Sequence, residues 1–185
     1  MQGKFITIEG CEGVGKSTQL ALLKEYFENN GIDAIFTREP GGTEIAEKIR
    51  GIILDANNKA LTPVAELLLY ASARRQHTEE KIIKALQEGK VVVCDRYADS
   101  TVAYQGYARN LDKQLIDTLN EIAMANVRGT KLTIFDEPEA GIDLWSFNSL
   151  IKVFENMYSR TKGTIMIISH QERILDIADK IVVPK

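Results

Sequence analysis

Long apolar runs, basic clusters and a set of cysteines are all missing from this sequence of 185 residues. Its two cysteines, Cys11 and Cys94, are too few for a disulfide scaffold and suit free thiols in a reducing compartment. No apolar run approaches the roughly 20 residues of a membrane span, so the sequence predicts no transmembrane helix. The formal net charge of -3 offers no basic footprint for nucleic acid, which leaves small anionic ligands as the better partners.

The composition is that of a globular protein, with 44% hydrophobic and 26% charged residues. The length suits one domain with a full core, over residues 1–185. Residues 1–4 lead into a predicted strand rather than a signal peptide. We therefore expect a cytoplasmic protein that binds neither membrane nor nucleic acid.

Strand and helix patterns alternate along the chain, which predicts an α/β fold with a mainly parallel sheet between two layers of helices. Neither a linker nor a repeat interrupts the alternation. Thr62 and Pro63 are suited to begin a long helix that Gly89 ends. The predicted strands cover 5–9, 34–37, 91–94, 131–135, 164–168 and 181–183. The predicted helices cover 15–29, 63–88, 111–125, 144–158 and 172–178.

Residues 10–17 match the phosphate-binding pattern G-x-x-x-x-G-K-[ST]. In this pattern the glycines, here Gly10, Gly13 and Gly15, expose backbone N–H groups to phosphate. Lys16 would then reach the outer phosphates, and the Ser17 hydroxyl would ligate magnesium. A predicted strand before the motif and a helix after it provide the context of a true P-loop, since a helix N-terminus favours anions. Thr18, the next residue, is also expected to bind the nucleotide.

Asp95 and Arg96 follow an apolar predicted strand. A carboxylate in that position can hold magnesium or its waters, and the guanidinium beside it can grip a second phosphate. A surface ion pair would explain the two residues equally well. The longer sequence around them favours the first interpretation.

Three segments, 37–43, 67–77 and 93–106, closely resemble the signatures of thymidylate kinases. The resemblance covers about residues 3–128, and several ordered matches make it highly specific. It implies a P-loop kinase fold and a site for a nucleoside monophosphate.

The resemblance also implies individual roles. Tyr70 stands where the family usually has phenylalanine and would stack on thymine, although core packing on its helix is a serious alternative. The other implied ligands are Arg74 and Gln105 near the base, Arg38 and Arg96 at the monophosphate, and Glu12 near the sugar hydroxyl. His77 on the same helix is expected to be structural.

After about residue 128 the sequence instead resembles the C-terminal part of an ABC-type ATPase. Asp136 and Glu137 match its Walker B pair, 140–143 its D-loop, and His170 its switch histidine. In that family these residues order magnesium, polarise the attacking water and touch the γ-phosphate. The sequence lacks the ABC signature loop and also the basic lid of thymidylate kinases.

We therefore hypothesise a recombinant chimera joined near residues 128–135, with a divergent natural kinase as the alternative. The hypothesis predicts the kinase strand order 2-3-1-4-5 with the last strand at the edge beyond. His170 would then lie a strand too far from the phosphate loop for its ABC role.

Three functions are compatible with these motifs. The first is a kinase that uses Mg²⁺ and ATP to phosphorylate dTMP, weakened by the missing lid, with Lys16, Asp95, Arg96 and Glu137 as catalytic residues. The Mg²⁺ ligands would come from Ser17, Asp95 and Asp136. The others are a nucleotide-binding scaffold without turnover and a weak ABC-like ATPase. A homodimer is compatible with each.

Overall fold

The structure is a computed structural model that describes a sheet and the helices that pack on it. The described residues are 3–9, 16–98, 111–124, 127, 131–136, 150–152, 154–155, 164–169 and 171–181. Predicted site residues outside these ranges are Gly10, Glu12, Gly13, Gly15, Gln105, Glu137 and His170. Asp136 is described through its backbone alone.

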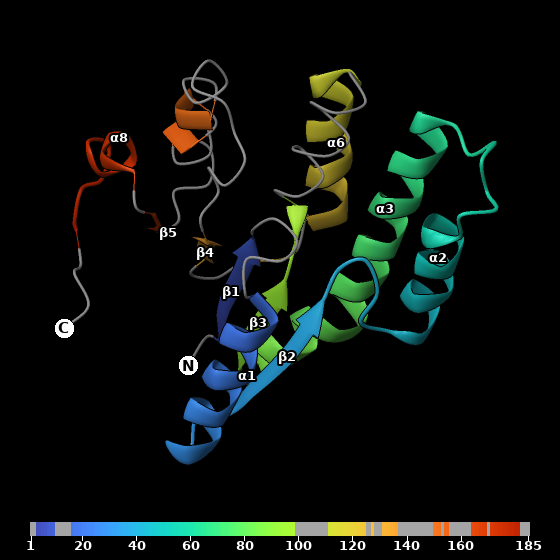
Figure 1. Ribbon diagram of the computed structural model, residues 1–185. Helices are drawn as coiled ribbons and strands as arrows, with labels where there is room; N and C mark the ends of the chain where they lie inside the picture. Colours follow the sequence, from blue (N-terminus) through green and yellow to red (C-terminus); the bar gives the residue numbers. More distant parts are fainter. Residues whose placement is uncertain are drawn as a thin grey trace.

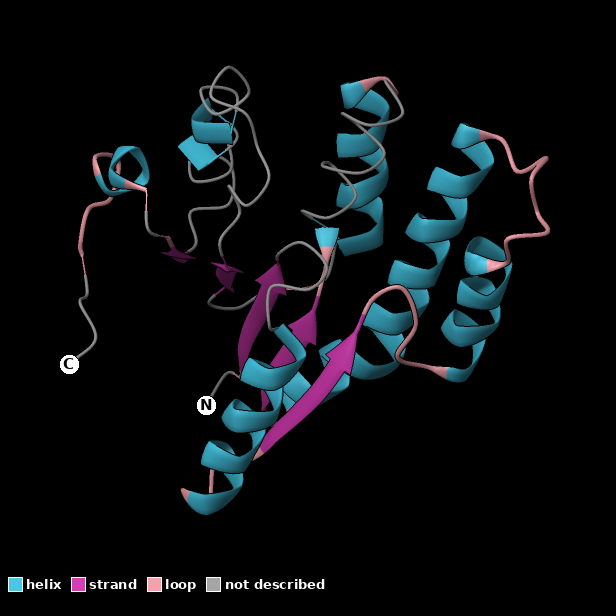
Figure 2. Cartoon of the chain, viewed as in Figure 1, coloured by secondary structure: helices cyan, strands magenta, loops and turns pink. Residues whose placement is uncertain are grey.

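Five parallel strands form one sheet in the order β2-β3-β1-β4-β5 (Figures 1 and 2). The strands are β1 (Lys4–Glu9), β2 (Ala34–Arg38), β3 (Val91–Asp95), β4 (Lys131–Asp136) and β5 (Thr164–Ile168). This confirms the predicted strand order. Because β4 separates β5 from β1, the strand that leads toward His170 is not adjacent to the strand that leads into the phosphate loop.

The described helices differ from the predicted helices more than the described strands differ from the predicted strands. Their bounds are α1 (Lys16–Asn29), α2 (Glu44–Leu54), α3 (Pro63–His77), the π-helical segment η1 (Thr78–Ile82), α4 (Ile83–Gln87), α6 (Lys113–Met124) and α8 (Glu172–Leu175). The long helix predicted over 63–88 is present, but it consists of α3, η1 and α4 in succession. Residues 150–152 and 154–155 are helical, as expected within 144–158.

The sequence prediction missed α2. Its local signals are nevertheless clear: the Thr43 side chain accepts a hydrogen bond from the Ala46 N–H, and Glu44 and Glu47 lie in the first turn. An N-cap threonine and early carboxylates both favour a helix start. The same capping occurs where it was predicted, at Thr62 before Pro63.

Near the C-terminus, the predicted helix is too long and the predicted strand is only partly tested. Helix α8 ends at Leu175 rather than at 178, because the chain turns there. Ile181 does not belong to a strand, and the rest of the expected strand lies outside the described residues.

Helices cover both faces of the sheet (Figure 1). Paired residues of parallel strands point to the same face, so Phe5 and Val92 share one face and Ile6 and Val93 the other. The first face packs against η1 and α4, and the ring of Phe5 meets that of Tyr97 edge-on at 4.9 Å. On the opposite face Phe36 of β2 contacts a phenylalanine of α1.

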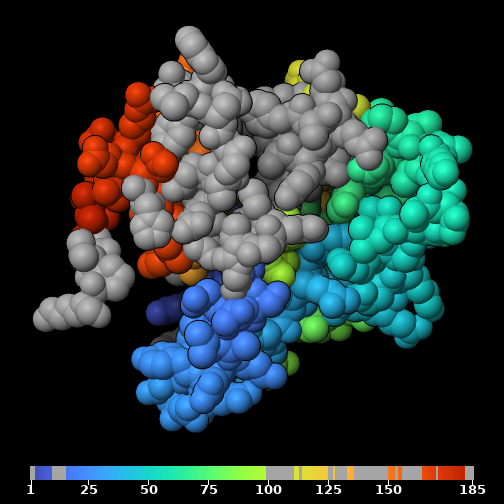
Figure 3. Space-filling view, in the orientation of Figure 1, coloured from blue at the N-terminus to red at the C-terminus, as the bar shows by residue number. Residues whose placement is uncertain are grey.

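Helix α1 uses only part of its surface for this packing. Phe27 contacts Phe36 at a centroid distance of 5.9 Å, whereas Leu22 and Tyr26 are exposed. In the space-filling view this blue segment stands at the surface (Figure 3). Lys16, at the other end of the helix, is buried. The helix is thus anchored where it begins, beside the end of β1.

Within the described ranges, no helix combines the length and the apolar character that a membrane crossing requires.

Cys94 provides a test of the packing of β3. Its thiol is fully buried and contacts the carbonyl of Arg96, and burial together with the Glu39 and Glu9 carboxylates raises its pKa well above the usual range. The reactive species is the thiolate, so we expect alkylation of native Cys94 at about pH 8 to be at least about tenfold slower than in the urea-unfolded chain. Peptide-resolved mass spectrometry measures both rates, and equal rates would contradict the packing.

Candidate functional site at the carboxyl ends of the strands

The carboxyl ends of β2, β3, β1 and β4 bring the predicted site residues to one edge of the sheet. Arg38, at the end of β2, pairs in register with Asp95, at the end of β3. Asp95 pairs in turn with Ile8 of β1, and Glu9 pairs with Phe135 of β4. Ligands of open parallel sheets bind outside this edge. The register therefore gathers the candidate residues where such a fold binds its ligand.

The N-terminus of α1 lies at the same edge. Lys16 opens the helix and is 8% exposed, while Ser17 and Thr18 are exposed. Free N–H groups and the helix dipole favour phosphate here. The glycines of the predicted phosphate loop precede Lys16 and lie outside the described part of the chain.

Asp95 has a carboxylate oxygen that is buried and lacks a hydrogen-bond donor among the described residues. Its Oδ1 is buried and accepts no hydrogen bond within the described chain. A buried oxygen of this kind is costly unless a ligand satisfies it. Because Mg²⁺ is held by one or two carboxylates together with waters and phosphates, Asp95 fits a magnesium site even though the described residues contain no cluster of three ligating side chains.

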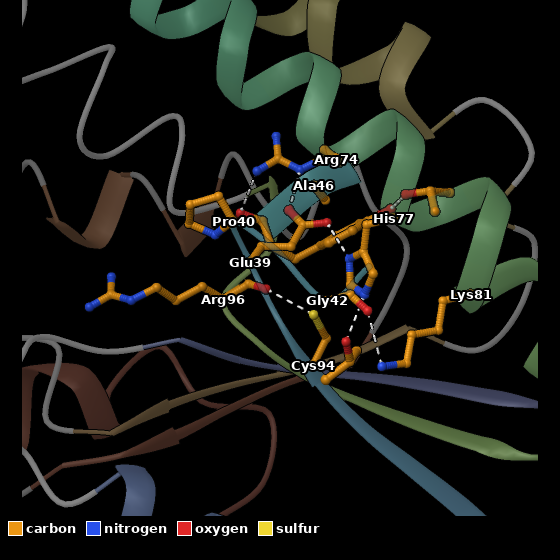
Figure 4. Close-up of polar contacts among 12 residues, drawn as sticks. Glu39, Pro40, Gly42, Ala46, Arg74, His77, Lys81, Cys94 and Arg96 are labelled. Carbon is orange, nitrogen blue, oxygen red and sulfur yellow. Dashed lines mark hydrogen bonds and ion pairs between the residues drawn. The ribbon is translucent and has the colours of Figure 1, made fainter. Parts of the chain in front are cut away.

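Arg96 has a strained backbone at the end of β3. Its φ is 65°, in the left-handed region that a non-glycine residue seldom adopts. The conformation is held by its N–H, which donates to the carbonyl of Ile8 at 2.9 Å, and by its carbonyl, which accepts from the Cys94 thiol at 3.1 Å. The side chain extends away from Cys94 and from the buried cluster described next (Figure 4).

A buried charged cluster, the Glu39 cluster, lies behind this edge. It consists of Glu39, Arg74, His77, Tyr97 and Asn120, all buried. Arg74 donates from Nε to Glu39 Oε2 at 2.7 Å (Figure 4). It also donates from Nη1 to Asn120 Oδ1 at 2.7 Å and from Nη2 to the carbonyl of Tyr97 at 3.1 Å. Burial lowers the pKa of the Arg74 guanidinium, but the carboxylates around it outweigh burial and raise that pKa.

This placement gives Arg74 structural partners that its sequence pattern did not indicate. All three of its guanidinium nitrogens donate to protein groups. Tyr70 lies one helical turn earlier on α3 and is half-buried. Contact of either side chain with a base stays a prediction.

His77 is fully buried, with a partner at each ring nitrogen. Nδ1 lies 3.0 Å from Glu39 Oε1, and Nε2 lies 2.7 Å from the Thr37 hydroxyl. These contacts suit a ring that donates from Nδ1 to Glu39 and accepts from Thr37 at Nε2. They fit the structural role expected for His77.

Tyr97 connects the Glu39 cluster to the strand end. Its N–H donates to Glu9 Oε1 at 2.7 Å, and its hydroxyl bonds with the Thr78 hydroxyl at 2.8 Å. Burial and the Glu39 carboxylate raise the pKa of this phenol far above its usual range. Tyr97 follows Asp95 and Arg96 directly, so these contacts fix the point at which both leave β3.

Sequence reasoning did not identify Glu9, Glu39 or Glu47 as parts of the site. Glu47 is the ion-pair partner of Arg38, whose side chain is half exposed. A carboxylate at the end of an apolar strand was the available signal for Glu9, as it was for Asp95. The pairings of Glu39 and Glu47 cross from loop or strand to helix and leave no mark in the local sequence.

The chain is similar to thymidylate kinases over nearly its whole length. The sequence pattern of one family, described as Thymidylate kinase, matches residues 8–181. A thymidylate kinase of Citrifermentans bemidjiense is 52% identical over 141 residues, which is 76% of this chain and 63% of the relative. One of Pelobacter propionicus is 50% identical over 134 residues, or 72% of this chain and 61% of the relative. The chain thus spans a little under two thirds of the length of these curated relatives.

A solved structure extends the similarity to the fold. The crystal structure of thymidylate kinase from Ehrlichia chaffeensis superposes with a TM-score of 0.74 at 34% sequence identity, covering 96% of this chain and 100% of that one. The family match continues past residue 128, where the kinase resemblance was expected to stop. It gives the hypothesis of a join to an ABC-type ATPase no support.

The Glu39 cluster predicts a large loss of stability for Glu39→Gln. The substitution leaves the Arg74 guanidinium buried without its counter-charge, which we expect to lower the free energy of unfolding by about 3 to 5 kcal/mol. Urea denaturation measures this change.

Glu44→Gln is the matched control, because Glu44 forms an exposed ion pair with Lys48. Such pairs contribute little, so its unfolding curve should coincide with that of the parent chain. A Glu39→Gln curve that also coincides would show that the buried pair is not needed for stability.

Proposed function

Because the chain belongs to the thymidylate kinase family, we propose that it transfers the γ-phosphoryl group of MgATP to dTMP, giving ADP and dTDP. The observation that carries the proposal is the gathering of Arg38, Asp95 and Arg96 at the edge of the sheet where α1 begins with Lys16. Phosphoryl transfer depends mainly on positioning and on stabilising negative charge, and these residue types supply both.

The donor nucleotide would bind at the start of α1. Backbone N–H groups of the phosphate loop, Gly10 to Gly15, would cradle its phosphates, while Lys16 neutralises the outer ones. Ser17, Asp95 and Asp136 would hold Mg²⁺ or its waters, and the ion would offset charge on the transferred phosphoryl group. Thr18 completes the donor residues, and Glu12 would lie near the sugar hydroxyl of the acceptor.

The acceptor would bind between the end of β3 and α3. Arg38 and Arg96 would grip its phosphate, for which planar guanidinium groups are well suited. Tyr70 would stack on the base, with Gln105 and the buried Arg74 bordering it. The family usually has phenylalanine at this position, so the Tyr70 hydroxyl is an additional group that the base site would have to hold.

We infer further that turnover is slow, from the sequence after β4. That segment does not resemble the basic lid of the family, and residues 10–17 contain no arginine. An arginine that contacts the transferred phosphoryl group in the transition state contributes about 10³ to 10⁵ in rate. A site without such an arginine should therefore work far below the usual rate.

The chimera remains a hypothesis that rests on the motifs at Asp136, Glu137 and His170. It divides a single P-loop domain into a kinase-like part, 1–128, and an ABC-like part, 129–185. Detection of the intact chain by mass spectrometry of a native source would count against an engineered origin. The alternative functions, a nucleotide-binding scaffold and a weak ATPase with Glu137 as base, are separated from the kinase by the next experiment.

We expect ADP release from MgATP to depend on dTMP. The rate should stay below the roughly 1–100 s⁻¹ typical of kinases and should vanish in Lys16→Ala, which removes the cation at the outer phosphates. A coupled assay with and without dTMP measures it. ADP release that ignores dTMP would favour the ATPase, and nucleotide binding without ADP release would favour the scaffold.

Asp95→Asn tests the metal assignment. The variant keeps the shape of the side chain but removes its charge, so the Mg²⁺ concentration at half-maximal rate should rise by about 10- to 100-fold. A magnesium titration of the dTMP-dependent rate measures this shift. Asp33→Asn is the control, because Asp33 is exposed at the opposite end of the sheet. An unchanged titration in Asp95→Asn would remove Asp95 from the metal site.

A further inference from the structure

Both carboxylate oxygens of Glu47, on α2, accept hydrogen bonds from two neighbouring residues. Both of its oxygens accept hydrogen bonds from Nη2 of Arg38, each at 3.1 Å, and Oε1 also accepts from the N–H of Gly42 at 2.9 Å. The Gly42 N–H lowers the pKa of Glu47 more than partial burial raises it, and Arg38 and Arg50 lower it further. The group is therefore a charged acceptor at neutral pH.

Among the residues that the structure describes, the Arg38 guanidinium is held through a single nitrogen, Nη2. Within the described ranges its Nη1 and Nε form no hydrogen bond, and its side chain is 54% exposed. A guanidinium is a rigid plane with five N–H donors. Fixing Nη2 therefore restricts the directions in which the remaining donors can point. The strand end that carries this side chain pairs in register with Asp95.

The glycine loop between β2 and α2 is shaped around this contact. A Cβ on Gly41 would overlap the Glu47 carboxylate, and a Cβ on Gly42 would lie 2.6 Å from Nε2 of His77. Both glycines also have positive φ angles, 126° and 88°. Because no side chain intervenes, the loop lets Glu47 reach the Gly42 N–H and Arg38 together.

We propose that Glu47 is the positioning residue for Arg38, holding its guanidinium by Nη2 so that Nε and Nη1 are preset to receive the phosphate of the acceptor nucleotide. This inference rests on the proposed function, in which Arg38 binds that phosphate. Glu47 itself does not touch the substrate.

Two effects of Glu47 oppose each other, and their balance decides the sign of the test. Presetting Arg38 removes part of the side-chain entropy that binding would otherwise cost. A carboxylate near a phosphate also repels it, but Arg50 lies close enough to lower the pKa of Glu47 and offsets that charge. The lower entropy cost should therefore outweigh the repulsion between Glu47 and the phosphate. Loss of Glu47 should then weaken phosphate binding.

Glu47→Gln tests this in binding assays with two probes, dTMP and thymidine. We expect calorimetry to show a rise of roughly threefold to tenfold in the Kd for dTMP. The Kd for thymidine, which has no phosphate, should not change. The side chain is partly exposed and the substitution keeps its shape, so the fold should persist.

The control and a double variant isolate the route through Arg38. Glu44→Gln, one turn earlier on α2, should leave both Kd values unchanged. In an Arg38→Gln background, Glu47→Gln should no longer alter the Kd for dTMP, because its target is gone.

Several outcomes would overturn the proposal. Tighter dTMP binding by Glu47→Gln would make Glu47 a competitor of the phosphate. Equal weakening for dTMP and thymidine, or weakening that persists without Arg38, would make it a support of the loop. If the parent chain binds dTMP and Glu47→Gln binds it equally well, only this inference fails. If the parent chain does not bind dTMP, the proposed function fails as well.

Discussion

The buried ion pair between Arg74 and Glu39 is the contact on which the arrangement of the site depends. Both side chains are almost entirely removed from solvent, and burying two charges costs several kcal/mol per ion unless each finds partners. Here the partners are complete: Glu39 divides its oxygens between Arg74 and His77, and Arg74 also reaches Asn120 and the carbonyl of Tyr97. Such a cluster tolerates few alternatives, because displacing one member leaves a buried charge unsatisfied.

The cluster fixes the charged residues of the site through their chain neighbours. Glu39 follows Arg38 in the sequence, and Tyr97 follows Asp95 and Arg96, so the buried residues determine where these three leave the sheet. Glu9 adds a link to β1 by accepting the N–H of Tyr97. The cluster thus joins the ends of β1, β2 and β3 to helices α3 and α6. A site built from strand ends needs such a frame, because isolated arginines would lose more entropy on binding phosphate.

Much of the fold, but less of the site, could be predicted from the sequence. Alternating apolar strands and helices, with the kinase resemblance, give the strand order and the edge at which Arg38 and Asp95 meet. Helix α2 was missed although Thr43 and Glu44 mark its start, because the preceding glycine loop was interpreted as a motif only. The partner of Arg74 could not be found, since Glu39 lies 35 positions away and pairs with it only in the folded chain. The kinase family also continues beyond residue 128, where the local motifs suggested another family.

Amide hydrogen exchange with and without dTMP tests directly whether the Glu39 cluster supports an acceptor site. We expect dTMP to slow exchange at residues 38–43 and 95–97, where the chain leaves β2 and β3. MgATP should slow exchange at the phosphate loop as well. Exchange in β5 and α8 should stay the same, because these elements lie at the far end of the sheet (Figure 1). Protection confined to β5 and α8, or no protection by dTMP at the ends of β2 and β3, would contradict an acceptor site built on the Glu39 cluster.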